Sequence, residues 1–271
     1  MTEGISTQGE KLVSLSSKEN IVSKTKVIAV TSGKGGVGKS TLTANIAFLL
    51  SKKNLKIAVI DADIGLANMQ VLFDVRPKFS LFDYIDGSAT LEETLTKTKY
   101  NNITLCAGKS GFQYAKGSSS FVFSRIVTDI VKLNTYDILL VDTGAGLNEY
   151  VQEFLNVSDE ILAVTTTDPS AITDAYALIK MVSQTKKKLL LCFNHTKNYQ
   201  IGATITQSIK TLAQKNQLNR KFMVIYIGSI SVTQNIQISA RKRVLFSMKF
   251  KEDKAYNDLN DIVDNLLKEL N

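Results

Sequence analysis

A glycine-rich stretch at residues 32–41, S-G-K-G-G-V-G-K-S-T, constrains the fold more than any other part of this sequence. An apolar run at residues 27–30 precedes it with the composition of a buried strand, and residues 42–50 follow with that of a helix. Glycines at such a turn let backbone N–H groups close around a phosphate at a helix N-terminus, where the helix dipole favours negative charge. The stretch therefore predicts a phosphate-binding loop; the alternative is a glycine-rich turn without a ligand.

Two lysines and a serine in this loop have separate expected roles. Lys39 is placed to reach the β- and γ-phosphate oxygens of a nucleotide, and Ser40 to offer its hydroxyl to Mg²⁺. Lys34 is a second lysine, which a plain phosphate-binding loop does not need. The loop residues predicted to contact the nucleotide are Gly33, Lys34, Gly35, Gly36, Val37, Gly38, Lys39, Ser40 and Thr41.

The sequence K-G-G-V-G-K-S-T resembles the deviant phosphate-binding loop of the ParA/MinD class of ATPases. In that class the extra lysine, here Lys34, crosses a dimer interface to the phosphates of the partner's nucleotide. A cation that a second molecule brings to a γ-phosphate raises hydrolysis by roughly 10³ to 10⁵ in GTPases. The resemblance implies a homodimer that forms on ATP binding, with Lys34 as a catalytic residue; the alternative is a surface lysine on a tight turn.

Length and composition indicate one α/β domain, or at most two. The chain has 271 residues, of which 44% are hydrophobic, and two prolines. No run of about eighteen apolar residues occurs, and residues 1–26 lack the apolar core of a secretory signal, so we expect neither a transmembrane helix nor a signal peptide. Cys106 and Cys192 both lie in apolar, strand-like runs and are interpreted as buried thiols of a cytoplasmic protein.

Basic residues are concentrated in the C-terminal third of the chain. Residues 175–251 hold fourteen of the 33 lysines and arginines and none of the 25 acidic residues. This part is predicted to present a positive surface that suits nucleic acid, an anionic membrane at the inner face of the cell or an acidic protein face. The alternative is a solvated surface without a partner.

Three aspartates follow predicted strands, at the edge of the sheet where open α/β folds bind ligands. Asp61 and Asp63 begin D-A-D-I-G-L-A-N after residues 56–60, and Asp142 begins D-T-G-A-G after residues 136–141. Asp142 matches the Walker B arrangement, which holds Mg²⁺, usually through a water. In the ParA/MinD class the second aspartate of D-x-D, here Asp63, positions the attacking water. The alternatives are a cap on a helix near residue 66 for Asp63 and a structural cap for Asp61.

Three motifs narrow the resemblance to one family. D-A-D-I-G-L-A-N at 61–68, D-T-G-A-G at 142–146 and T-T-T-D-P-S-A-I-T-D-A-Y-A-L-I-K at 165–180 resemble the FlhG (YlxH/FleN) family. These ATPases control flagellar number and placement. The resemblance covers residues 26–270 and implies the GTPase FlhF and flagellar switch (C-ring) proteins as partners.

The sequence Phe193-Asn194-His195 matches the adenine-recognition position of the class, where an asparagine amide both donates to and accepts from the adenine edge. Relatives carry a proline beside the base, where this chain has G-S-I-S at 228–231. Adenine is expected rather than guanine, because F-N-H-T-K is not an N-K-x-D element.

Alternating apolar runs and helical patterns predict a single doubly wound α/β domain over residues 26–271, with a mainly parallel sheet of seven or eight strands and helices on both faces. The predicted strands are 27–30, 57–60, 103–106, 138–141, 161–164, 189–193 and 224–227, with 244–246 as an eighth. Helices are expected at 81–85, 91–96, 120–133 and 170–184. A last helix, 256–270, is expected to pack on the core because its polar face is acidic, the wrong sign for an anionic membrane.

Residues 1–25 are predicted to be a flexible polar tail. Within it, T-Q-G-E-K-L-V at 7–13 resembles the D-Q-A-x-x-L-R segment with which FlhG relatives stimulate FlhF, and Gln8 and Leu12 are the matching residues. The predicted function is an ATP-dependent dimerisation switch that slowly hydrolyses ATP to ADP and phosphate. The alternatives are a ParA-like DNA-partition ATPase and a scaffold that binds nucleotide without hydrolysis.

Overall fold

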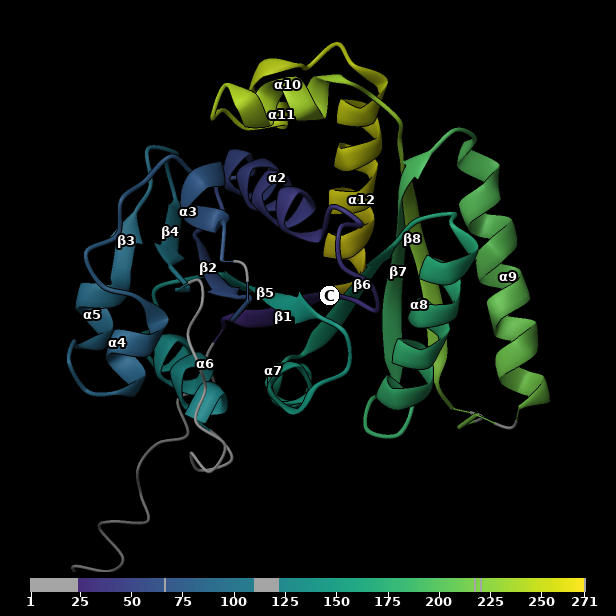
Figure 1. The fold of residues 1–271 in the computed structure, drawn as a ribbon, viewed down its shortest axis with the longest axis horizontal. Coiled ribbons are helices and arrows are strands. Elements are labelled where there is room, and N and C mark those ends of the chain that lie inside the picture. Colours follow the sequence, from purple (N-terminus) through teal and green to yellow (C-terminus); the bar gives the residue numbers. More distant parts are fainter. Residues whose placement is uncertain (1–23, 66, 110–121, 217, 220, 271) are drawn as a thin grey trace, which may run out of the picture.

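The computed structural model describes residues 24–65, 67–109, 122–216, 218–219 and 221–270 (Figure 1). Its centre is an eight-stranded sheet with the order β3-β4-β2-β5-β1-β6-β7-β8. Neighbouring strands are parallel except for β3 and β4. Helices cover both faces of the sheet, so the predicted doubly wound, mainly parallel α/β fold is confirmed.

Most strands are short apolar runs, because a parallel sheet covered on both faces buries both sides of each strand. All seven strands predicted up to residue 227 are present. The strand bounds are β1 Lys26–Ser32, β2 Ile57–Ala62, β3 Leu95–Lys97, β4 Ile103–Cys106, β5 Ile138–Ala145, β6 Glu160–Thr165, β7 Lys188–Thr196 and β8 Met223–Ser231.

The eighth strand is not the one that the sequence predicted. Residues 244–246 form no strand, because Leu245 directly precedes the short helix α11 (Phe246–Lys249) and is buried there. The additional strand is β3, where the sequence predicted the end of a helix. A capping box between Thr90 and Glu93 begins the one-turn helix α5, and Leu95 then pairs with Cys106 at the sheet edge. In a longer helix the backbone N–H and C=O groups of residues 95–97 would bond within the helix; here they form hydrogen bonds with β4 instead.

One face of the sheet is covered by the helix that follows the glycine-rich loop, by the short helix beside it and by the C-terminal helices (Figure 1). These are α2 Lys39–Lys52, α3 Met69–Leu72, α10 Asn235–Arg241, α11 Phe246–Lys249 and α12 Lys254–Leu270. The last of them packs on α2 and β8 and buries Leu259, Ile262 and Leu266. The interpretation of the last helix as a packing helix is confirmed.

The opposite face carries the remaining helices: α4 Leu81–Ile85, α5 Leu91–Thr94, α6 Val122–Lys132, α7 Glu149–Val157, α8 Pro169–Val182 and α9 Tyr199–Lys215. Alternate residues of the central strand β1 contribute to both layers. Ile28 and Val30 belong to the core under α2 and α12, whereas Val27 and Ala29 belong to the cores under α6–α9. Because β1 lies between β5 and β6, the loop that follows it starts near the middle of one edge of the sheet.

The basic residues of 175–251 are divided between the two faces, because α9 and α10–α11 lie on opposite sides of the sheet. Lys188 forms ion pairs of 3.1 Å with both Glu160 and Glu269. Lys186 donates to two backbone carbonyls, those of Asn156 and Ser158. Part of this basic segment therefore serves the fold itself.

Some predictions fall on residues that the structure does not describe. The tail motif with Gln8 and Leu12 lies outside the described residues, as do the first two residues of the predicted helix 120–133. Among the helices of the described part, none has the length and apolar composition needed to cross a membrane.

Candidate functional site

The glycine-rich loop connects the end of β1 at Ser32 to the start of α2 at Lys39. Gly36 and Gly38 have φ angles of 78° and 89°, which side-chain-bearing residues rarely adopt. Gly38 is the N-cap of α2, and a Cβ there would collide with the amide nitrogen of Asn194. The loop thus opens at the N-terminus of a 14-residue helix, as a phosphate-binding loop requires.

Lys39 is held inside the site by a buried aspartate. Its ammonium lies 3.0 Å from Oδ1 of Asp142, and their side chains are 7% and 0% exposed. Thr43, one turn further along α2, donates to the same oxygen at 3.0 Å. Ser40 is half-buried, with its hydroxyl oxygen 3.5 Å from the Lys39 ammonium. Ser40 and Asp142, the two residues predicted to hold Mg²⁺, therefore both lie beside Lys39.

A second buried carboxylate stands next to Asp142. Asp61 on β2 is paired in register with Asp142 on β5. Burial, with the negative charge of Asp142 as a further cause, raises the pKa of Asp61 to about 7. Its Oδ2 accepts the backbone N–H groups of Asn68 and Met69, each at 2.9 Å. Asp61 thus closes the N-terminus of α3, which supports the structural-cap interpretation.

Asp63 is not the cap of the following helix. Its Oδ1 accepts the N–H of Gly65 at 3.1 Å, and α3 begins only at Met69. The same oxygen lies beside Gly144, close to the end of β5. Asp63 is half-buried, so its carboxylate stays at the surface of the site. Its predicted role in positioning water stays a prediction.

Lys34 points away from Lys39 and contacts the start of α8. Its ammonium donates to the Ser170 hydroxyl and lies 3.7 Å from Oδ1 of Asp168. Asp168 is the N-cap of α8 and accepts the N–H groups of Ser170 and Ala171. The side chains of Lys34 and Asp168 are 46% and 55% exposed. Lys34 is therefore an exposed cation at the mouth of the loop, held by a weak surface contact.

Asn194, at the C-terminal end of β7, packs directly against the loop. Its amide nitrogen donates to the backbone carbonyl of Val37 at 2.9 Å, and its amide oxygen accepts the N–H of His195 at 2.9 Å. One amide N–H and one oxygen lone pair remain for another partner. Contact with adenine stays a prediction, and Asn194 has a second, structural role that the sequence did not indicate.

Three polar residues of the site were not assigned a role from the sequence: Thr43, Asp168 and Ser170. Thr43 follows Lys39 by four positions, so helical spacing on α2 could have indicated it. Asp168 and Ser170 meet Lys34 only because β6 neighbours β1 in the sheet. No local pattern predicts that neighbourhood.

The residues present fit a nucleotide phosphate and a magnesium ion. Oδ2 of Asp142 is buried and has no hydrogen-bond partner among the described residues. Such an unpaired carboxylate oxygen is costly unless a cation or water completes its shell. A Cβ built on Gly35 or Gly36 would meet no other atom within 4 Å, so the loop is open at these two residues.

Comparison with known proteins agrees with this geometry. A family model described as "ParA: NUBPL iron-transfer P-loop NTPase" matches residues 23–267. The flagellum site-determining protein YlxH of Helicobacter pylori is 36% identical over 91% of this chain and 83% of its own length. The chain belongs to the FlhG (YlxH/FleN) branch of the ParA/MinD family of P-loop ATPases.

A second curated relative supports this FlhG assignment, and solved structures agree with the fold. The antiactivator FleN of Pseudomonas aeruginosa is 30% identical over 85% of this chain and 82% of its own length. Among solved structures, MinD of Pyrococcus furiosus superposes with a TM-score of 0.76 at 20% identity, covering 90% of this chain and 99% of MinD. The MinC:MinD complex of Aquifex aeolicus gives a TM-score of 0.74 at 25% identity, covering 90% and 96%.

The two cysteines of this FlhG-type chain lie on separate strands, Cys106 on β4 and Cys192 on β7, and both are buried. Burial raises the pKa of the Cys106 thiol to about 12 and raises that of Cys192 as well. Their interpretation as buried thiols is confirmed. The described residues contain no group of three or more histidine, cysteine or acidic side chains that would hold a metal ion.

Proposed function

We propose that this protein is an ATP-dependent dimerisation switch that slowly hydrolyses ATP to ADP and phosphate and controls flagellar number and placement. The observation that carries the proposal is the pair of lysines in one loop: Lys39 is buried beside Asp142, and Lys34 is exposed at the mouth. A buried lysine suits a phosphate bound within the chain, and an exposed one suits a phosphate on a second molecule. The flagellar role is proposed from YlxH and FleN, whose names describe site determination and antiactivation.

The proposal gives each residue of the site a separate role in ATP binding or hydrolysis. Backbone N–H groups of the loop and Lys39 hold the phosphates of ATP, while Ser40 and Asp142 hold Mg²⁺. When bound, Mg²⁺ supplies positive charge that offsets the charge developing on the transferred phosphoryl group. Asp63 orients a water for in-line attack on the γ-phosphate, and Lys34 of each protomer contacts the phosphates of the other.

Size-exclusion chromatography with light scattering, combined with phosphate release, tests the proposal. We expect a monomer without nucleotide and with ADP, and a dimer with ATP and Mg²⁺. Phosphate release per chain should rise with protein concentration, because the active species is the dimer. A chain that stays monomeric with ATP, or hydrolyses ATP at a rate independent of concentration, contradicts the switch. ATP binding without phosphate release would instead favour the scaffold.

FlhF is a proposed partner, through the tail at residues 1–25. A peptide covering residues 1–20 is expected to raise GTP hydrolysis by the cognate FlhF. Gln8→Ala or Leu12→Asp should abolish the effect, since residues four positions apart would share one face of the peptide if FlhF binds it as a helix. The reversed sequence is the control. A wild-type peptide without effect at saturating concentration contradicts this assignment.

DNA partition is the second candidate function, and the basic content of residues 175–251 is the observation that favours it. It requires binding of double-stranded DNA that depends on ATP and falls steeply with salt. A fluorescent oligonucleotide titrated at two salt concentrations, with ATP and with ADP, separates the two functions.

Under the flagellar proposal the protein works in the cytoplasm, with flagellar switch proteins as further partners at the inner face of the membrane.

A further inference from the structure

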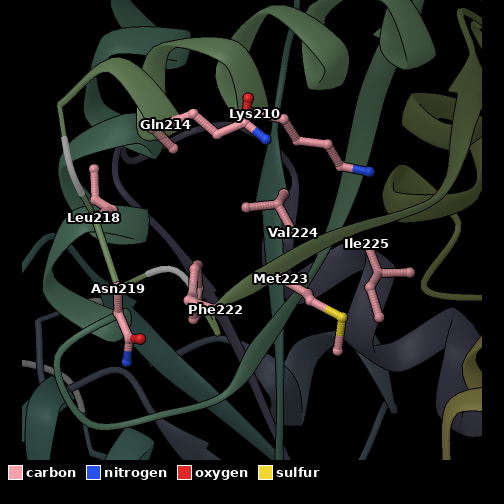
Figure 2. Close-up of a pocket in the computed structure, with 9 residues that line it drawn as sticks. Lys210, Gln214, Leu218, Asn219, Phe222, Met223, Val224 and Ile225 are labelled. Atoms are coloured by element: carbon pink, nitrogen blue, oxygen red, sulfur yellow. The ribbon is translucent and has the colours of Figure 1, made fainter.

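A groove of about 890 Å³ lies at the outer edge of the sheet, between the end of α9 and the start of β8 (Figure 2). Leu218, Phe222, Met223, Val224 and Ile225 give it an apolar lining, and Lys210 lies at its rim. Met223 is 56% exposed, whereas Val224 is buried at 4%. A buried apolar residue next to an exposed one is the form of a site for an inserted apolar side chain.

The groove is separate from the nucleotide site. Met223 is the first residue of β8, while the phosphate-binding loop follows Ser32, the last residue of β1. All strands from β1 to β8 on this side of the sheet are parallel, so the two sites lie at opposite ends of the strands. A ligand in the groove therefore leaves the phosphate-binding loop accessible.

β8 is the outermost strand of the sheet, and two side chains of α12 hydrogen-bond to its C-terminal half. Asn265 of α12 donates to the carbonyl of Ile227, and Asp258 of α12 accepts the N–H of Ser231. These contacts protect the C-terminal half of the edge. The N-terminal half begins at Met223 and borders the groove, so an extended peptide has both a sheet edge and an apolar cavity to bind.

One lysine lines the groove, and three more stand close to its lining residues in the sequence. Lys210 lines it, Lys215 and Lys221 flank the turn between α9 and β8, and the Lys187 carbonyl accepts the N–H of Met223. None of the four forms an ion pair with another described residue. The segment 175–251 has no acidic residue, and none is among the residues that line the groove. The groove thus combines apolar side chains with two neutral amides, Gln214 and Asn219, and the positive charge of Lys210.

We propose that this groove binds an acidic peptide segment of another protein, which inserts a bulky apolar side chain against Phe222 and Val224. Nucleic acid fits less well, because its phosphates need a continuous track of cations rather than an apolar floor. A second copy of this chain also fits less well, because a two-fold contact would place one lysine rim against the other. The proposal does not depend on the proposed nucleotide switch.

The test selects binders from a random dodecapeptide library displayed on phage, against the full chain in EDTA without nucleotide. We expect the selected peptides to be acidic with one or two large apolar residues. In fluorescence polarisation, Met223→Asp and Lys210→Glu should each raise the Kd by about tenfold or more. ATP with Mg²⁺ should leave the Kd unchanged, so a failure of the nucleotide switch would not affect this result.

The matched controls lie elsewhere on the surface. Met248→Asp replaces a methionine that is 51% exposed on α11, and Lys251→Glu reverses an exposed charge nearby; both should leave the Kd unchanged. Peptides without an acidic consensus, or peptides that bind Met223→Asp as tightly as the wild type, overturn the proposal. The proposal is also overturned if the wild type binds a double-stranded oligonucleotide, or associates with itself, and the groove variants abolish that binding.

Discussion

The ammonium of Lys39 lies 3.0 Å from Oδ1 of Asp142, although the two residues are 103 positions apart in the chain. Both side chains are almost fully buried. This pair joins the lysine predicted to hold phosphate to the aspartate predicted to hold Mg²⁺. We expect nucleotide and Mg²⁺ to replace the contact, so that each buried charge has a partner of opposite sign in both states.

Removal of one member of this pair is expected to destabilise the nucleotide-free protein. Asp142→Ala should lower the free energy of unfolding by about 3–5 kcal/mol, because it leaves the Lys39 charge buried and unpaired. The double variant Lys39→Met with Asp142→Leu should recover most of this loss. Urea denaturation measures both. Lys132→Ala is the control, since Lys132 and Asp129 are also 3.0 Å apart but Lys132 is 69% exposed. If this control lowers the free energy of unfolding as much as Asp142→Ala does, the argument is contradicted.

Asp61 is expected to make stability depend on pH. Burial raises its pKa in the folded protein from 3.8 to about 7, so the folded form holds the proton more tightly than the unfolded chain. The resulting stabilisation is complete below pH 3.8 and is lost as the pH rises through about 7. Asp61→Asn keeps an acceptor for Asn68 and Met69 but does not titrate. In EDTA without nucleotide, the difference in unfolding free energy between the variant and the wild type should grow by a few kcal/mol between pH 4 and pH 8; a constant difference rules out the effect.

Asp63→Ala should trap the ATP-bound dimer. The variant loses the carboxylate that orients water but keeps Lys39 and the loop backbone, so turnover should fall by about 10²- to 10⁴-fold with ATP binding retained. Chromatography in ATP should then show a longer-lived dimer than the wild type. Asp86→Ala, at an exposed position after α4, is the control. A variant that remains monomeric in ATP shows that Asp63 has another role.

Lys34→Ala should separate binding from turnover. Its contact with Asp168 and Ser170 is largely exposed, so the fold should be unaffected. Dimerisation in ATP should be lost, and turnover should fall by about 10³-fold. ATP affinity should change little, because Lys39 remains in the same chain. Equal losses of ATP affinity in Lys34→Ala and Lys39→Ala would exclude a role across the dimer.

Asn194→Ala distinguishes two roles of one amide. If Asn194 contacts the base, the variant should lose about tenfold in affinity for ATP and less for ITP, whose base lacks the 6-amino group. If Asn194 only supports the loop through the Val37 carbonyl, both nucleotides should lose affinity equally. Isothermal titration with both nucleotides measures the difference. His195→Ala, an exposed neighbour, is the control.

The sequence by itself determined the features that depend on local spacing. The strand, the glycine-rich loop and the helix are contiguous, so the position of Lys39 at a helix N-terminus followed from residues 27–50 alone. The buried strands were also predictable, because a parallel sheet covered on both faces demands continuous apolar runs. The antiparallel β3 was not, since its short run Leu95–Lys97 is compatible with either a helix or an edge strand.

Only the tertiary structure decided which polar groups meet. Lys39 reaches Asp142 because β5 lies next to β1, and Lys34 reaches Asp168 because β6 lies on the other side of β1. The sequence showed two aspartates in D-A-D but not that Asp61 would be buried beside Asp142 and Asp63 left at the surface. Strand order is set by packing over the whole chain. Contacts between residues far apart in sequence, including the groove between α9 and β8, therefore leave no local pattern from which they could be predicted.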